Sequence, residues 1–189
     1  MEPVGIGDMA PDVELRDSQG DVVRLSAVWQ QRPAIVFFLR HLGCPCTGQQ
    51  LETIRRHLEK FHQAGAAVVI VTLGLPQKAT SLFEGPERPD WVLIDPNQQA
   101  YRAYGLGRGG VWQLAGPQVW WTAFKAMLQG RVGRPIGDVR QLAGTFLVDR
   151  QGQLRYVHRA RHSADFPDHE AILARLAELA GSKSQQTTP

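Results

Sequence analysis

Cysteine is scarce in this sequence, and the two that occur lie almost side by side. The 189 residues contain only Cys44 and Cys46, separated by Pro45. Two cysteines form at most one disulfide, which excludes a small secreted fold that depends on several such bonds. A pair at this spacing instead predicts redox or metal chemistry.

Long apolar runs and blocks of one charge are also missing. No stretch of 18 apolar residues occurs, and the acidic start has no apolar core of signal-peptide length; we therefore expect a cytoplasmic protein that does not span a membrane. The net charge is +3, with no basic cluster. This argues for solubility and against nucleic-acid binding.

Buried strands alternate with amphipathic helices along the chain. Six apolar residues in a row, 34–39, predict a strand covered on both faces, and apolar positions at helical spacing predict a helix over 45–63. The other expected elements are a hairpin at 13–25, strands at 66–72 and 90–95, helices at 76–84, 97–105 and 168–179, and a hairpin at 144–159. This order predicts a three-layer α/β/α fold with a central mixed sheet, one domain over 1–181 and a disordered tail over 182–189.

Residues 105–141 interrupt this alternation as an insertion. They contain Trp112, Trp120 and Trp121, and a helix is expected over 116–129. Three interpretations stay open: the insertion packs on the edge of the domain, caps the active site, or forms the face of a homodimer, since aromatic residues are enriched at interfaces.

The cysteines lie where the buried strand passes into the long helix. Proline favours the first helical position, so Pro45 makes Cys44 the N-cap residue. The free amides and the dipole of a helix start stabilise a thiolate, which is the reactive form. Arg40 and His41, just upstream, can add positive charge. The pattern predicts that Cys44 is a nucleophile.

Helix geometry opposes a disulfide between Cys46 and that nucleophile. Side chains two residues apart on a helix diverge by roughly 200°, so a bond between the two sulfurs requires distortion of the first turn. Such a disulfide would be easily reduced, which suits catalysis. Thr47 can offer its hydroxyl to the sulfur of Cys44. The plainer interpretation is that a buried cysteine is only a small apolar side chain.

Four segments resemble one known family. They are "GDMAPDVELRDSQGDVVRLS", "FFLRHLGCPC", "VLIDPNQQAYRAYGL" and "GTFLVDRQGQLRYVHR". Over about residues 5–180 the chain resembles the AhpC/TSA-type, peroxiredoxin-like branch of the thioredoxin superfamily. This resemblance implies a thioredoxin-like fold and a cysteine that attacks a peroxide or a disulfide at the start of the active-site helix.

The resemblance also assigns positions, with departures. The first cysteine of a Cys-x-x-Cys turn falls on Cys44 and the second on Thr47, so Cys46 lies between the two family positions. The threonine that true peroxiredoxins have three residues before the cysteine is here His41. The loop expected opposite the cysteine falls at Gly144, with Thr145 within reach of the site. Arg140 resembles an arginine that holds the thiolate in some relatives.

The leading hypothesis is therefore a thiol-dependent oxidoreductase without an organic cofactor or metal. Its substrate would be a small peroxide or disulfide. Its reductant would be a thioredoxin- or glutaredoxin-like protein or a low-molecular-weight thiol, with Cys46 as the candidate resolving thiol. Two alternatives come from other classes: a thioredoxin-fold protein that binds Cu(I) or another metal, and a non-catalytic interaction module that uses the Trp-rich insertion.

Overall fold

The computed structural model describes residues 3–41, 45–74, 88–110 and 138–184. Its elements are β1 (Glu14–Arg16), β2 (Val22–Arg24), α1 (Leu25–Trp29), β3 (Ala34–Phe38), α2 (Pro45–Gln63), β4 (Ala67–Thr72), β5 (Trp91–Ile94), α4 (Gln99–Ala103), β6 (Gly144–Val148), β7 (Leu154–Arg159) and α7 (His169–Ser184). Within these ranges, no helix combines the length and the apolar character needed to cross a membrane.

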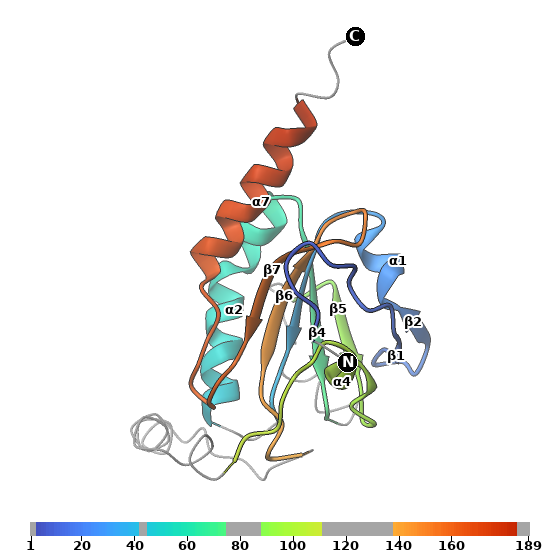
Figure 1. The fold of residues 1–189 in the computed structure, drawn as a ribbon, viewed down its shortest axis with the longest axis vertical. Coiled ribbons are helices and arrows are strands. Elements are labelled where there is room, and N and C mark those ends of the chain that lie inside the picture. The colour runs from blue at the N-terminus through green and yellow to red at the C-terminus, as the bar shows by residue number, and fades with distance from the viewer. Residues whose placement is uncertain (1–2, 42–44, 75–87, 111–137, 185–189) are drawn as a thin grey trace.

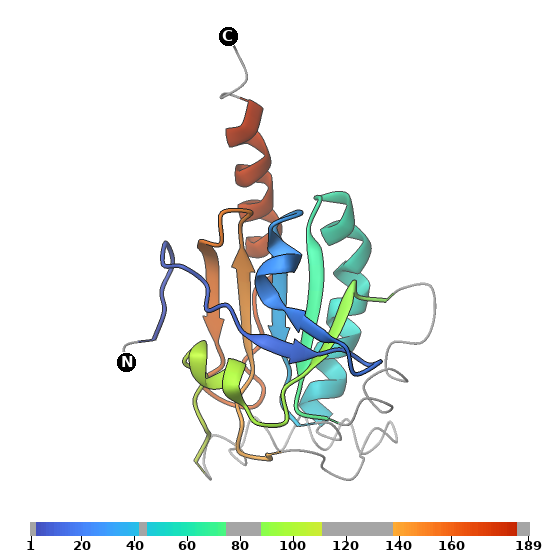
Figure 2. The same ribbon diagram turned by 90° about the vertical axis from the view of Figure 1, so that its right-hand side faces the viewer.

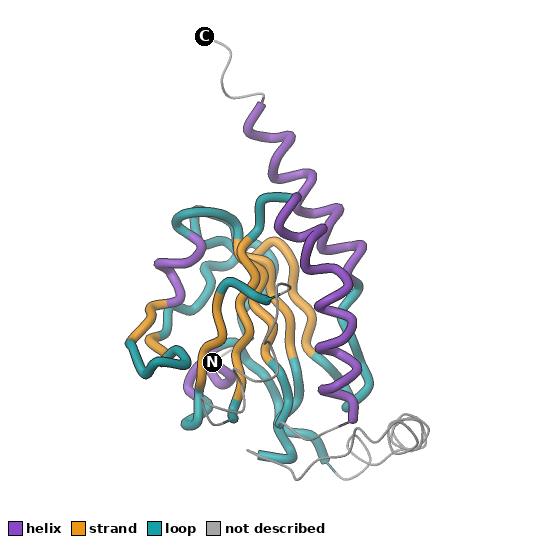
Figure 3. Tube along the Cα trace, turned by 180° about the vertical axis from the view of Figure 1, so that it is seen from behind, coloured by secondary structure: helices purple, strands orange, loops and turns teal. Residues whose placement is uncertain are grey.

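The strands form one seven-stranded mixed sheet in the order β2-β1-β5-β4-β3-β6-β7. Strands β3, β4 and β5 are parallel neighbours, and β6 pairs with β3 in the antiparallel sense. Helices α2 and α7 lie along one face (Figures 1 and 3), while α1 and α4 lie on the other (Figure 2). The predicted three-layer arrangement with a central mixed sheet is confirmed.

Strand β3 is the centre of the core, and its side chains divide between the two faces. Val36 and Phe38 belong to the cluster under α1 and α4, whereas Ile35 and Phe37 belong to the cluster under α2 and α7. All are fully buried. A strand covered on both faces must be apolar at every position, which explains the uninterrupted apolar run.

The structure contains one helix that was not expected and a longer C-terminal helix than expected. The predicted hairpin ends at residue 25, but β2 stops at Arg24 and Leu25 begins α1. This five-residue helix is held by burial of Leu25, Val28 and Trp29 rather than by propensity, because so short a helix is unstable alone. Helix α7 continues to Ser184 and so includes residues 182–184 of the predicted tail. The helices expected at 76–84 and 116–129 lie outside the described residues.

A stack of four rings joins α7 to α2 and the sheet. His169 at the start of α7 stacks on His57 of α2, with ring centroids 4.8 Å apart, and both rings lie near Phe61. Phe37 of β3 also stacks on His169, with ring centroids 6.1 Å apart. His57 Nδ1 lies 2.9 Å from the Thr53 carbonyl oxygen. The stack fixes the first turn of α7 against the domain.

The buried position of His169 weakens its affinity for a proton. Burial, together with the neighbouring His57, lowers its pKa to about 4. Asp168, Glu170 and the Pro167 carbonyl act in the opposite direction but do not compensate. Its Nε2 is buried and has no hydrogen-bond partner among the described residues. The folded state therefore favours the neutral imidazole.

We predict that acidification weakens the fold through His169. Above pH 6.5 the imidazole is neutral in both states; between pH 6.5 and 4 the unfolded chain binds a proton that the folded chain does not. The free energy of unfolding should fall across this window by up to about 3 kcal/mol from this group. Urea titrations at several pH values measure this loss. The His169→Phe variant, which keeps a ring in the stack, should show a flatter pH dependence, and an unchanged slope would contradict the assignment.

Candidate active site

Helix α2, whose first turn contains Cys46, begins at the edge of the sheet where β3, β4 and β5 end (Figure 1). Ligand sites of open α/β sheets occur at this edge. Helix α2 starts at Pro45, as predicted. Cys44, which precedes Pro45 in the sequence, lies outside the described residues, so its role as an N-cap stays a prediction.

A hydrogen bond spans the segment that contains Cys44. The Thr47 hydroxyl donates to the His41 carbonyl oxygen at 3.1 Å, and both residues are buried. Thr47 was expected to offer its proton to the sulfur of Cys44. In the structure this proton is used to hold the backbone at His41, which fixes the distance between the end of the strand and the first turn of α2.

Arg40 is a buried cation next to this segment. Only 4% of its surface is exposed. Its Nη2 donates to the Val139 carbonyl at 2.9 Å and its Nε to the Gln141 carbonyl at 3.1 Å. Carbonyl oxygens compensate part of the cost of burying the guanidinium. Arg40 thereby connects the strand exit to residues 139–141.

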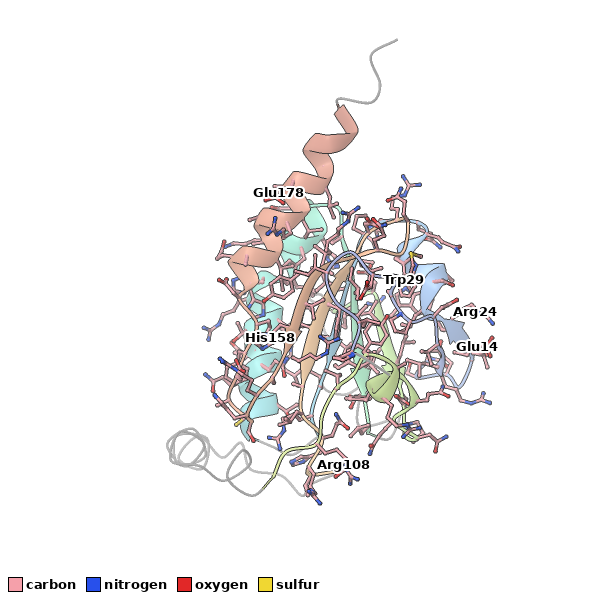
Figure 4. All side chains as sticks on the ribbon, in the orientation of Figure 1. Glu14, Arg24, Trp29, Arg108, His158 and Glu178 are labelled. Carbon is pink, nitrogen blue, oxygen red and sulfur yellow. The ribbon has the colours of Figure 1, made fainter. Side chains whose placement is uncertain are left out.

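Those carbonyls belong to the stem of the insertion, where its two ends meet. Gly109 N donates to the Arg140 carbonyl at 2.6 Å, and Leu142 N donates to the Gly107 carbonyl at 3.1 Å. Arg108 forms a 2.7 Å ion pair with Asp138, and Figure 4 shows Arg108 at the end of the molecule where α2 begins. The stem is thus anchored to Arg40, shortly after the end of β3. The body of the insertion, 111–137, lies outside the described residues, so its roles as a cap or a dimer face stay predictions.

The side chain of Arg140 also contacts the stem. It is exposed, and its Nε lies 3.4 Å from the Gly109 carbonyl, while its backbone amide donates to Asp138. The described contacts therefore give Arg140 a place in the insertion stem. Its expected contact with the thiolate of Cys44 stays a prediction.

Gly144 and Thr145, which the resemblance places opposite the cysteine as substrate-binding residues, are packed in the sheet, and their contact with a substrate stays a prediction. A Cβ atom at Gly144 would lie 2.3 Å from a methyl group of Leu106, so Leu106 occupies the space left by the missing side chain. Thr145 is fully buried between Phe37 and His158 in the sheet. Its hydroxyl has no partner among the described residues. The glycine is thus required for core packing.

Cys46 is in the first turn of α2 with only 2% of its surface exposed. An external reductant cannot approach a sulfur at this depth unless the start of the helix opens. Burial therefore makes Cys46 a poor first target for a substrate, in agreement with the assignment of the nucleophile to Cys44.

Sequence reasoning missed two residues that border this site. The Tyr101 hydroxyl donates to the Leu39 carbonyl at 2.6 Å, immediately before Arg40. Asp95, only 1% exposed, accepts hydrogen bonds from the backbone amides of Gln99 and Ala100 at the start of α4. An aspartate shortly before a helix is a recognisable cap signal. Nothing in the sequence shows what the hydroxyl of Tyr101 contacts.

The sequence profile of the AhpC/TSA family matches residues 6–157. The chain belongs to the AhpC/TSA family. Its solved structural relatives include the peroxidoxin BcpB of Mycobacterium tuberculosis, with a TM-score of 0.62 and 22% identity, covering 92% of this chain and 97% of that one. The thioredoxin-like fold expected from the resemblance is confirmed.

Two curated relatives of this AhpC/TSA protein carry functional names. The prostamide/prostaglandin F synthase of Danio rerio is 26% identical over 183 residues, covering 93% of this chain and 90% of the relative. The human peroxiredoxin-like 2C is 22% identical over 172 residues, covering 86% and 76%. At this distance, the substrates of the relatives do not transfer directly.

We predict that Gly144→Ala destabilises this AhpC/TSA protein by about 1–3 kcal/mol, because the new methyl group overlaps Leu106 in a packed core. Gly107→Ala is the matched control, since no atom lies within 4 Å of its Cβ position. Thermal and urea unfolding provide the measurement. Equal effects of the two substitutions would refute the packing role.

A second pair of variants tests the bond across the cysteine segment. Thr47→Val leaves the buried carbonyl of His41 without this donor and should cost about 1–3 kcal/mol. Thr53→Val removes a similar hydroxyl-to-carbonyl bond from the exposed side of α2 and should cost no more than about 0.5 kcal/mol. Urea unfolding distinguishes them, and a neutral Thr47→Val would show that the bond contributes nothing to stability.

Proposed function

We propose that this protein is a thiol-dependent oxidoreductase that reduces a small peroxide, or by the same chemistry a disulfide, with Cys44 as the nucleophile. The observation that carries the proposal is the start of α2 at Pro45, directly after Cys44, at the ligand-binding edge of an AhpC/TSA fold. The free amides of the first turn would stabilise a thiolate there.

The proposed reaction has two stages. The Cys44 thiolate attacks one oxygen of the peroxide, the O–O bond breaks, and the products are a Cys44 sulfenic acid and an alcohol or water after protonation of the leaving oxygen. A thiol then attacks the sulfenic sulfur and releases water, and a second thiol reduces the resulting disulfide. With a disulfide as substrate, the thiolate forms a mixed disulfide directly.

The buried side chains around the segment support this cycle. Arg40 holds a permanent positive charge next to His41, and such a charge favours an anion on a nearby sulfur. His41 can place a peroxide oxygen or accept a proton. Because Cys46 is buried in the first turn of α2, we infer that an external thiol resolves the sulfenic acid. The reductant would be a thioredoxin- or glutaredoxin-like protein or a low-molecular-weight thiol, in keeping with a cytoplasmic location.

We predict that stoichiometric hydrogen peroxide oxidises Cys44 to a sulfenic acid that dimedone traps. Mass spectrometry should find the adduct in the wild type and in Cys46→Ser, and should not find it in Cys44→Ser. Peroxide consumption with dithiothreitol or reduced thioredoxin should be abolished in Cys44→Ser and retained in Cys46→Ser.

Three outcomes would overturn parts of this proposal. Absence of any adduct would exclude peroxide chemistry. Loss of turnover in Cys46→Ser, with the sulfenic acid still formed, would make Cys46 the resolving thiol. Metal that co-purifies at one equivalent and protects both cysteines from alkylation would favour the metal-binding alternative.

A further inference from the structure

We propose that Tyr101 is a positioning residue: its buried hydroxyl holds the exit of β3 in place and so sets the reactivity of Cys44. This inference rests on the proposed function of Cys44. Tyr101 itself is on α4 and belongs to the layer opposite α2.

The hydroxyl binds at the point where two neighbouring strands separate. Tyr101 Oη lies 2.6 Å from the Leu39 carbonyl oxygen and 3.0 Å from the Val71 carbonyl oxygen. Leu39 N in turn donates to the same Val71 carbonyl at 2.9 Å. The Tyr101 hydroxyl thus binds carbonyl oxygens at the ends of both β3 and β4. Leu39 directly follows β3, and the chain continues from it to His41.

The ring and backbone of Tyr101 hold this hydroxyl rigidly. The side chain is fully buried, and its ring packs edge-on against Phe38 with centroids 5.1 Å apart. Asp95 accepts hydrogen bonds from the amides of Ala100 and Tyr101. Burial, with a smaller contribution from Asp95, raises the pKa of Tyr101 well above its ordinary value. The phenol therefore remains a proton donor throughout the working pH range.

Three side chains in succession fix the segment that leads to the nucleophile. Tyr101 holds the carbonyl of Leu39, Arg40 binds the insertion stem, and Thr47 holds the carbonyl of His41. Of these contacts, that of Tyr101 lies farthest upstream and comes from the opposite layer. Its loss leaves the fully buried Leu39 without a side-chain donor at its carbonyl and allows the strand end to shift. On the proposed function, a shift of this strand end changes the surroundings of the thiol that follows it in the chain.

Tyr104 provides a closely matched control. It follows α4 directly, is equally buried, and its ring lies 4.9 Å from the same Phe38 ring. Its hydroxyl, however, has no hydrogen-bond partner among the described residues. Tyr101→Phe and Tyr104→Phe therefore remove the same atom from the same layer, and only the first breaks a contact with the strand ends.

The test is the pH dependence of Cys44 alkylation by iodoacetamide, with the adduct at Cys44 resolved from Cys46 by mass spectrometry. All proteins are compared where urea unfolding shows them fully folded. Tyr101→Phe should slow alkylation at neutral pH about fivefold to tenfold and shift its midpoint to higher pH, since a small displacement of a reacting group has a large effect on rate. Tyr104→Phe should stay within about twofold of the wild type.

The outcomes separate this inference from the proposed function. If Tyr101→Phe loses stability but keeps the wild-type rate and midpoint, Tyr101 is only structural and the inference is wrong. Equal changes in alkylation rate and midpoint in Tyr101→Phe and Tyr104→Phe would also overturn the inference. Alkylation needs no peroxide, so the two experiments can fail separately. If peroxide forms no adduct but Tyr101→Phe still shifts the midpoint of alkylation, the proposed reaction is rejected and the positioning role of Tyr101 is supported.

Discussion

Strand β3 is buried on both faces, so the polar residues that follow it must find partners inside the protein. Arg40 and His41 are both buried, although neither type of side chain is stable in an apolar environment without compensation. The structure supplies partners from three directions: carbonyls of the insertion stem for the guanidinium, the Thr47 hydroxyl for the backbone of His41, and the Tyr101 phenol for the backbone of Leu39. These contacts hold residues 39–41, which lead from β3 toward α2.

The two helical layers contribute to this exit in different ways. The layer of α2 and α7 is held by the ring stack of Phe37, His57, Phe61 and His169, which fixes the first turn of α7. In the layer of α1 and α4, the Tyr101 hydroxyl binds the carbonyl oxygens of Leu39 and Val71 at the end of the sheet. Strand β3 contacts both layers, because Val36 and Phe38 pack in one cluster and Ile35 and Phe37 in the other.

The insertion is integrated into the same network at its base. Its two ends pair with each other at Gly107–Gly109 and residues 140–142, and Arg40 binds the resulting stem. A buried guanidinium thus connects the stem to the exit of β3.

Much of this protein was determined by the sequence alone. The apolar run of β3, the helical spacing of α2 and the proline at its start predicted the layers, the sheet and the start of α2 at Pro45, because these features depend on local periodicity and capping. The five-residue helix α1 was missed since it is stabilised by burial and not by its own hydrogen bonds. The roles of Gly144, Arg40 and Tyr101 were decided only by the tertiary structure. Leu106, the insertion stem and the Leu39 carbonyl come from distant parts of the chain, and no local pattern records which of them meets which side chain.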